Sequence, residues 1–161
     1  MKADNKMRKQ KKRTPLRRFL RGVRWAVLLC LVFNVIAAYA PFVNLPDLDA
    51  AELETRAILH APAGMVVARD EYGVRDPRIL SAIRKHTVGD GHMSPMDALI
   101  YVSDFIEPGR EPFPGLEKAR GLAEKDIFEA MCCCAELTEK HLRSRGQSIH
   151  PRTLQLLETY S

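Results

Sequence analysis

The chain has 161 residues, enough for one domain with a hydrophobic core, and a formal charge of +5. Residues 1–24 carry eleven Lys and Arg against one acid, whereas the remainder carries 14 basic and 19 acidic residues. The positive charge therefore belongs to a tail, and the mildly acidic remainder excludes a nucleic-acid-binding domain, whose folded surface would be basic.

The N-terminal segment has two parts of opposite character. Residues 1–24 are expected to form a solvated basic tail, and residues 25–46 carry no charge. A helix over the uncharged residues would reach about 33 Å, against roughly 30 Å for the hydrocarbon core of a bilayer, although Pro41 and Pro46 interrupt it. Residues 25–43 are interpreted either as a single-pass membrane anchor with the N-terminus inside, or as a buried helix or a non-native reading frame.

From residue 44 onward the pattern predicts consecutive short helices. Asp76-Pro77, Ser94-Pro95 and His150-Pro151 are start signals, because each pairs a capping side chain with a proline at the first helical position. The expected helices run from Asp47 or Asp49 to Leu59, and over 62–72, 77–86, 94–106, 116–124, 126–145 and 150–160. No stretch alternates with the period of a strand, so the predicted fold class is all-α.

The helix over residues 94–106 is apolar nearly all round and is therefore predicted to be buried. Asp104 is the only charge inside its apolar run. A buried carboxylate needs a cation or hydrogen-bond donors, because removing it from water costs several kcal/mol. Asp104 is consequently either an ion-pair partner of a core arginine, a residue of a less buried helix, or a functional group.

The cysteines and histidines are less informative when taken singly. Cys132, Cys133 and Cys134 are consecutive on a predicted helix, so their side chains diverge and are expected to be small apolar filler. His60, His86 and His150 each stand at a predicted helix end, where they would suit an anion.

Several motifs together resemble a known family. They are LHAPAG (59–64), ARDEYG (68–73), AIRKHT (82–87), MSPMDALIYVSDFIEPGR (93–110), FPG (113–115) and RGQSIHPRTL (145–154). In this order and spacing they resemble the C-terminal two-thirds of the bacterial HD-domain phosphohydrolases of the symmetrical bis(5'-nucleosyl)-tetraphosphatase type. The resemblance implies that residues 44–161 form a truncated HD-domain helical bundle.

The resemblance also implies a chemistry and its residues. The family binds a divalent metal, with iron expected, and cleaves diadenosine tetraphosphate into two ADP. By motif, Asp104 resembles the last metal ligand, while His60, His86, Thr87 and Arg110 resemble phosphate contacts. The segment that resembles the closure over the nucleoside comprises Gln147, Ser148, Ile149, His150, Pro151 and Arg152. A cytoplasmic homodimer with a dinucleoside polyphosphate or ADP as its ligand is the corresponding expectation.

One departure from the family pattern changes this expectation. The family has a metal-ligand His and then a His-Asp doublet upstream of the motif at residues 59–64, whereas this chain has no histidine before His60 and no His-Asp dipeptide. Three of the four ligands that define the site are therefore absent, and one carboxylate cannot hold such a metal. We expect no stoichiometric metal and negligible turnover. The alternatives are a nucleotide-binding remnant or a membrane-anchored helical interaction module, with residues 1–43 either a frameshift product or a genuine replacement.

Overall fold

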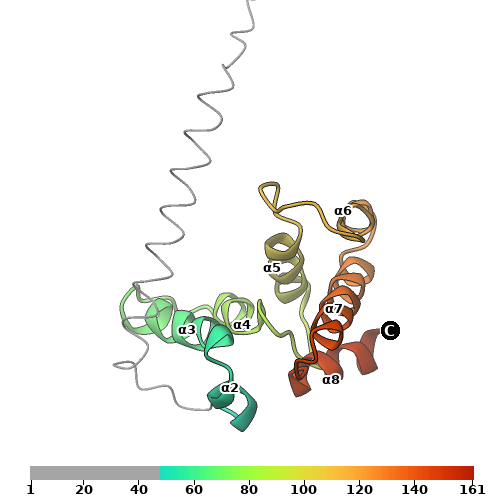
Figure 1. Ribbon diagram of the computed structural model, residues 1–161. Coiled ribbons are helices and arrows are strands. Elements are labelled where there is room, and N and C mark those ends of the chain that lie inside the picture. The colour runs from blue at the N-terminus through green and yellow to red at the C-terminus, as the bar shows by residue number, and fades with distance from the viewer. Residues whose placement is uncertain (1–47) are drawn as a thin grey trace, which may run out of the picture. The chain divides into compact units, whose positions relative to one another are not determined.

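The computed structural model describes residues 48–161, which all belong to one contact unit (Figure 1). The predictions for the basic tail at 1–24 and the apolar segment at 25–43 lie outside these residues. Across 48–161, no helix combines the length and the hydropathy needed to cross a bilayer.

The described chain consists of helices and connecting turns. The elements are α2 (Ala50–Glu54), the 3-10 helix η1 (Arg56–Ile58), α3 (His60–Asp70), α4 (Pro77–Lys85), α5 (Pro95–Phe105), α6 (Leu116–Ala123), α7 (Ile127–Ser144) and α8 (Pro151–Tyr160). No strand occurs between residues 48 and 161. The all-α prediction is confirmed for this part of the chain.

Most helices begin where the capping pattern predicts. The Ser94 side chain accepts a hydrogen bond from the Asp97 backbone amide, and the Asp97 carboxylate accepts one from the Ser94 amide, which makes a capping box ahead of Pro95. Asp76 and His150 cap α4 and α8 in the same local manner, each followed by proline. These starts are set by neighbours in sequence, which is why the sequence alone locates them.

Two helix boundaries differ from the prediction. The single helix expected to end at Leu59 is broken at Thr55, whose backbone leaves the helical region (φ −119°, ψ 87°), so α2 and η1 replace it. The next helix begins at His60 rather than Pro62. Pro62 is tolerated there because the amides of a first helical turn have no partner within the helix.

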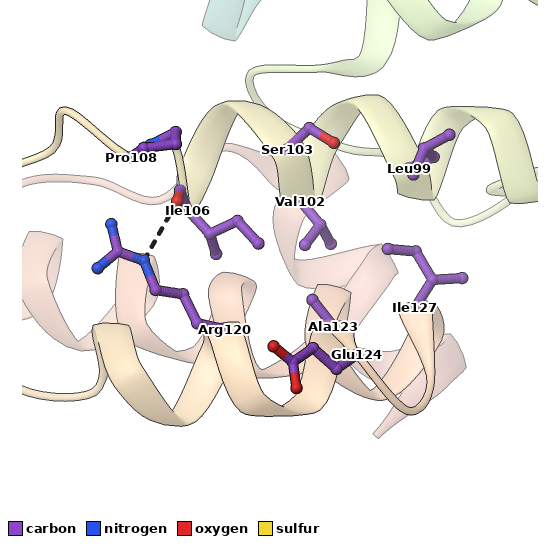
Figure 2. Close-up of a pocket in the computed structure, with 9 residues that line it drawn as sticks. All are labelled: Leu99, Val102, Ser103, Ile106, Pro108, Arg120, Ala123, Glu124 and Ile127. Carbon is purple, nitrogen blue, oxygen red and sulfur yellow. Dashed lines mark hydrogen bonds between the residues drawn. The ribbon is translucent and has the colours of Figure 1, made fainter. Parts of the chain in front are cut away.

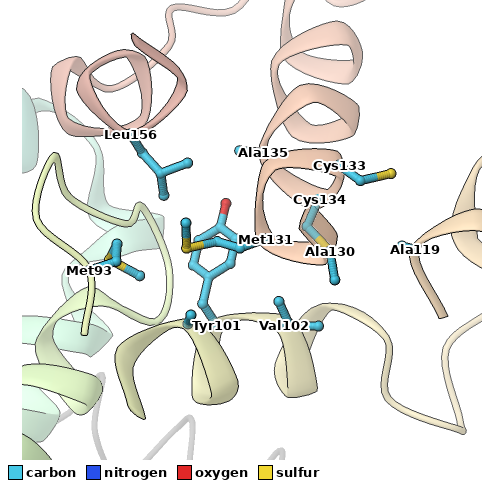
Figure 3. Close-up of a cluster of buried hydrophobic side chains, with 11 residues drawn as sticks. Met93, Tyr101, Val102, Ala119, Ala130, Met131, Cys133, Cys134, Ala135 and Leu156 are labelled. Atoms are coloured by element: carbon cyan, nitrogen blue, oxygen red, sulfur yellow. The ribbon is translucent and has the colours of Figure 1, made fainter. Parts of the chain in front are cut away.

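The hydrophobic core lies among α5, α6, α7 and α8 (Figure 3). It is built largely from small side chains around a few larger ones: Met93, Ala98, Tyr101, Val102, Ala119, Ala130, Met131, Cys133, Cys134, Ala135 and Leu156. Cys133 and Cys134 pack here as free thiols, as expected for apolar filler, and burial raises the pKa of Cys134 to about 12. The other helices extend this core, since α4 packs on α5 and α3 packs on α4 (Figure 1).

The prediction that the helix over residues 94–106 is buried is wrong for half of its surface. Ala98 and Val102 are fully buried, but Leu99 is 51% and Ile100 42% exposed, and Asp104 is exposed as well. Within residues 48–161, other helices pack against only one face of α5. The apolar periodicity of a sequence does not show whether an apolar face is packed against another element. Asp104 therefore does not need a buried ion-pair partner, and the less buried alternative for this helix is the one observed.

Candidate functional site

Three of the predicted site residues meet where α3 begins and α4 ends. His60 is the first residue of α3, His86 follows the last residue of α4, and Thr87 comes next in the chain. The Nε2 atoms of His60 and His86 are 3.1 Å apart, and the Thr87 hydroxyl oxygen lies 2.9 Å from His60 Nε2 and 3.2 Å from His86 Nε2. The packing of α3 on α4 brings these groups together.

Both histidine rings have the same tautomer, fixed by the backbone. His60 Nδ1 lies 2.8 Å from the Ala57 carbonyl oxygen, and His86 Nδ1 lies 2.7 Å from that of Ile83. Because a carbonyl oxygen only accepts, each Nδ1 carries a proton and donates it. The two Nε2 atoms therefore face each other, and the Thr87 hydroxyl lies within hydrogen-bond distance of both. Groups that can accept a hydrogen bond or bind a metal thus meet at one point, which suits a cation.

The neutral form of His60 is further favoured by its surroundings. Burial lowers the pKa of His60, the Ala57 carbonyl and the Asp104 carboxylate act in the opposite direction, and the nearby His86 adds to the lowering. Asp104 thus acts electrostatically on His60 from the exposed face of α5. Asp104, the predicted metal ligand, and His60, a predicted phosphate contact, therefore interact electrostatically.

The two imidazoles have the chemistry of a metal-ligand pair. Histidines that bind metals usually donate their second ring N–H to a carbonyl or carboxylate, as His60 and His86 do. Their separation of 3.1 Å is also reasonable for two nitrogens bound side by side to one ion at about 2.1 Å each. The two imidazoles therefore suit one side of a cation site. The Asp104 carboxylate acts on His60 electrostatically, but within residues 48–161 these three residues do not form a group whose ligand atoms all lie within 4.8 Å of one another.

Arg110, predicted to contact phosphate, folds back onto the end of α5. Its Nη2 donates to the Asp104 backbone carbonyl at 3.0 Å, and its guanidinium carbon lies 5.4 Å from the centroid of the Phe105 ring. Its Nε is buried and makes no hydrogen bond. The charge of Arg110 is thereby held next to Asp104 by the backbone and by an aromatic face.

The predicted nucleoside segment at residues 147–152 is divided in its environment. Gln147, Ser148 and Pro151 are exposed and Ile149 is half-buried, whereas His150 and Arg152 are engaged with acids of α2. His150 also caps α8, because its Nδ1 accepts a hydrogen bond from the Arg152 amide at 3.2 Å. The structure therefore gives His150 and Arg152 partners away from His60 and His86.

A second cluster of potential ligands lies at these acids. Within residues 48–161, Asp49, Glu52 and His150 offer ligand atoms that all lie within 4.8 Å of one another. Glu52 is 1% exposed, yet Arg84 contacts it at 2.5 Å and Arg152 at 3.7 Å. Two guanidinium groups already neutralise the acids, so this cluster suits an ion-pair network better than a metal. The sequence motif Asp49-x-x-Glu52 signals a capping box, but not the burial of Glu52 or its pairing with Arg84.

The groove of about 540 Å³ shown in Figure 2 lies on another side of α5, between this helix and α6. Its walls are mainly apolar, with Arg120 and Glu124 at the rim, and Arg120 Nε donates to the Ile106 carbonyl at 3.3 Å. The lining consists of Leu99, Val102, Ser103, Ile106, Pro108, Arg120, Ala123, Glu124 and Ile127. It does not include His60, His86 or Asp104.

Comparison with known proteins identifies three relatives whose sequences are similar to this chain. The chain is 41% identical over 97 residues to a symmetrical bis(5'-nucleosyl)-tetraphosphatase of Halalkalibacterium halodurans, covering 60% of this chain and 51% of that protein. It is 34% identical over 132 residues to the Bacillus subtilis protein of the same name, covering 78% and 70%. A third, from Staphylococcus aureus, is 32% identical over 110 residues, covering 65% and 54%. The chain thus spans between about half and 70% of the length of these relatives.

A solved structure supports the fold. A Clostridium acetobutylicum protein described as a predicted HD superfamily hydrolase involved in NAD metabolism matches with a TM-score of 0.67 and 32% identity. The match covers 71% of this chain and 60% of that one. No protein-family model matches the chain. On the strength of the relative that is matched over 70% of its length, and of a fold neighbour from the same superfamily, the chain belongs to the HD-domain family of symmetrical bis(5'-nucleosyl)-tetraphosphatases.

Proposed function

We propose that this chain binds ADP and symmetrical dinucleoside polyphosphates beside His60, His86 and Asp104, with little or no turnover. The substrate class is taken from the names of the relatives. The observation that carries the placement is the pair of imidazole Nε2 atoms 3.1 Å apart, with the exposed Asp104 carboxylate of α5 acting electrostatically on His60. Residues 44–161 then form the part of the family's domain that this site needs.

A divalent metal at this point would be held by His60 and His86, with the Asp104 carboxylate moving in from α5 as a further ligand, and iron is the first candidate because the family resemblance implies it. When bound, such a metal lowers the pKa of a water molecule and offsets phosphate charge. An imidazole nitrogen without a proton binds a cation directly, whereas a phosphate oxygen, itself an acceptor, binds an imidazole N–H. Arg110 provides a permanent charge beside them.

The proposal of low turnover rests on the donors that the chain contains. The sequence has no histidine before His60 and no His-Asp dipeptide, and within residues 48–161 the candidate donors at this point are His60, His86 and Asp104. Three donors on an open face hold a metal weakly compared with a complete set of ligands supported by neighbouring residues. We therefore propose binding without efficient hydrolysis. The homodimer and the cytoplasmic location stay predictions.

The test is a calorimetric titration of the purified full chain with ADP and diadenosine tetraphosphate, with and without added Fe²⁺ or Mn²⁺, together with metal analysis and an assay of ADP release. We expect substoichiometric metal after dialysis, ADP binding that strengthens when metal is supplied, and negligible release. His86→Ala should abolish the effect of metal.

The matched control is His141→Ala, which removes an exposed imidazole from α7. It should bind ADP as the original chain does. Equal binding by His86→Ala and His141→Ala would contradict the placement of the site, and robust turnover with stoichiometric metal would contradict the proposal of low activity.

A further inference from the structure

Three side chains that can carry positive charge converge on the first turn of α2. Arg84 comes from α4, and His150 and Arg152 come from the start of α8. Arg84 forms contacts of 2.5 and 2.7 Å with the two carboxylate oxygens of Glu52, and Arg152 Nη2 lies 3.2 Å from Asp49. His150 Nε2 lies 3.3 Å from Asp49. Since His150 Nδ1 accepts the capping hydrogen bond, its Nε2 carries the proton and faces the acid.

Apart from the ion pairs of Asp49, its N-cap, and Glu52, α2 makes few stabilising contacts with the described residues. Glu52 is the only buried residue of α2, and Leu53, its largest apolar side chain, is 65% exposed. A helix of five residues is not stable on its own, because helix nucleation is unfavourable. Among the described residues, α2 is therefore attached to the body chiefly by carboxylates, for which another anion that binds guanidinium groups can compete.

Without α2, the two guanidinium groups and the Nε2–H of His150 would form an anion site. The side chains of Arg84 and Arg152 are only 14% and 23% exposed, so their charges need a counter-ion. Arg152 stands in the first turn of α8, a helix of ten residues whose N-terminus adds a favourable dipole for anions, and Arg84 of α4 shares the Glu52 carboxylate with it. Arginine forks bind carboxylates and phosphates with the same geometry, so the two carboxylates occupy positions that phosphate oxygens would also take.

We propose that Arg84, His150 and Arg152 form a binding site for a diphosphate group, and that α2 covers this site as a removable acidic strap. A diphosphate matches the two carboxylates in number of anionic groups. Assigning the diphosphate to a nucleotide rests on the proposed function, whereas the site and the strap do not. Arg84 turns to Glu52 of α2, whereas the imidazoles of His60 and His86 contact each other and Thr87.

The test compares Glu52→Gln with Glu54→Gln in the full chain. Both variants remove one negative charge from α2, but Glu54 is exposed whereas Glu52 is buried between Arg84 and Arg152. Thermal unfolding is followed against inorganic pyrophosphate at fixed ionic strength. Because Glu52→Gln removes the main competitor, it should bind pyrophosphate about tenfold more tightly than Glu54→Gln or the original chain. Adding Arg152→Gln to Glu52→Gln should remove that gain, and equal responses of Glu52→Gln and Glu54→Gln would overturn the proposal.

A second measurement uses the original chain, in case Glu52→Gln does not fold. Arg56 is exposed directly after α2, so trypsin cleavage at this residue reports release of the strap. Pyrophosphate should accelerate this cleavage severalfold over chloride at matched ionic strength, and an unchanged rate would overturn the proposal. ADP in place of pyrophosphate tests the nucleotide assignment: acceleration supports it, and no acceleration overturns it while leaving the diphosphate site intact. A response that persists in His86→Ala separates this site from the one at His60 and His86.

Discussion

The two faces of α5 differ in burial, although both belong to one short helix. The inner face places Tyr101 and Val102 in the core (Figure 3). Ala98 is buried on the same face, and each of the three is 4% exposed or less. The outer face presents Leu99 and Ile100 to solvent together with Asp104. Packing dictates the residues of the inner face, whereas the outer face is open to a ligand or a cover. The functional proposal depends on this difference.

The largest effect is expected on the inner face. Tyr101→Ala should lower the free energy of unfolding by about 3–5 kcal/mol, because it leaves a cavity in a packed core. Urea unfolding followed by circular dichroism measures this loss. Leu99→Ala on the outer face should cost about 0.5 kcal/mol or less. Equal costs for the two variants would mean that the outer face is also packed.

An intermediate effect is expected where the loop after α5 turns into α6. Gly115 has φ +99°, and a Cβ there would overlap the tip of Leu137, whereas Gly73 has φ +68° with open space around it. Gly115→Ala should therefore cost about 2–3 kcal/mol, from backbone strain plus overpacking. Gly73→Ala should cost about 1 kcal/mol, from strain alone. Urea unfolding curves of the two variants compare the losses in free energy of unfolding. A larger loss for Gly73→Ala would contradict the close packing of Leu137 against Gly115.

The smallest effect concerns the pH dependence of stability at the histidine junction. The pKa of His60 is lowered by burial, so the unfolded chain binds a proton more readily than the folded chain. The stability contributed by neutral His60 is present above pH 6.5, the ordinary value, and is lost as pH falls through the lower pKa of the folded state. In the presence of a chelator, His60→Gln should flatten the fall in stability between pH 7.5 and 5. An unchanged slope would contradict the role of burial.

The fold could largely be predicted from the sequence, because its signals are local. Ser94-Pro95 and Asp76-Pro77 start their helices through contacts within the first turn, and both are located correctly. The break at Thr55 was missed, since no glycine or proline marks it. Burial was predicted less well, because apolar periodicity in α5 cannot tell a packed face from an uncovered one.

The site could be predicted only in part, because its residues lie far apart in the sequence and meet only through tertiary packing. His60 and His86 stand at helix ends that sequence analysis located, but their convergence depends on how α3 packs on α4. Glu52 gave a local capping signal, and its burial follows from Arg84 and Arg152, which lie on other helices. The family resemblance predicts the candidate residues, and the structure shows which of them are in contact.

The most direct test of the central claim is anomalous diffraction from crystals of the full chain grown with Zn²⁺. We predict a metal peak about 2.1 Å from both His60 Nε2 and His86 Nε2, on the side facing Asp104. A peak at Asp49, Glu52 and His150 instead, with none at the two imidazoles, would contradict the account, because it would make the ion-pair cluster the metal site and leave the outer face of α5 without its proposed chemistry.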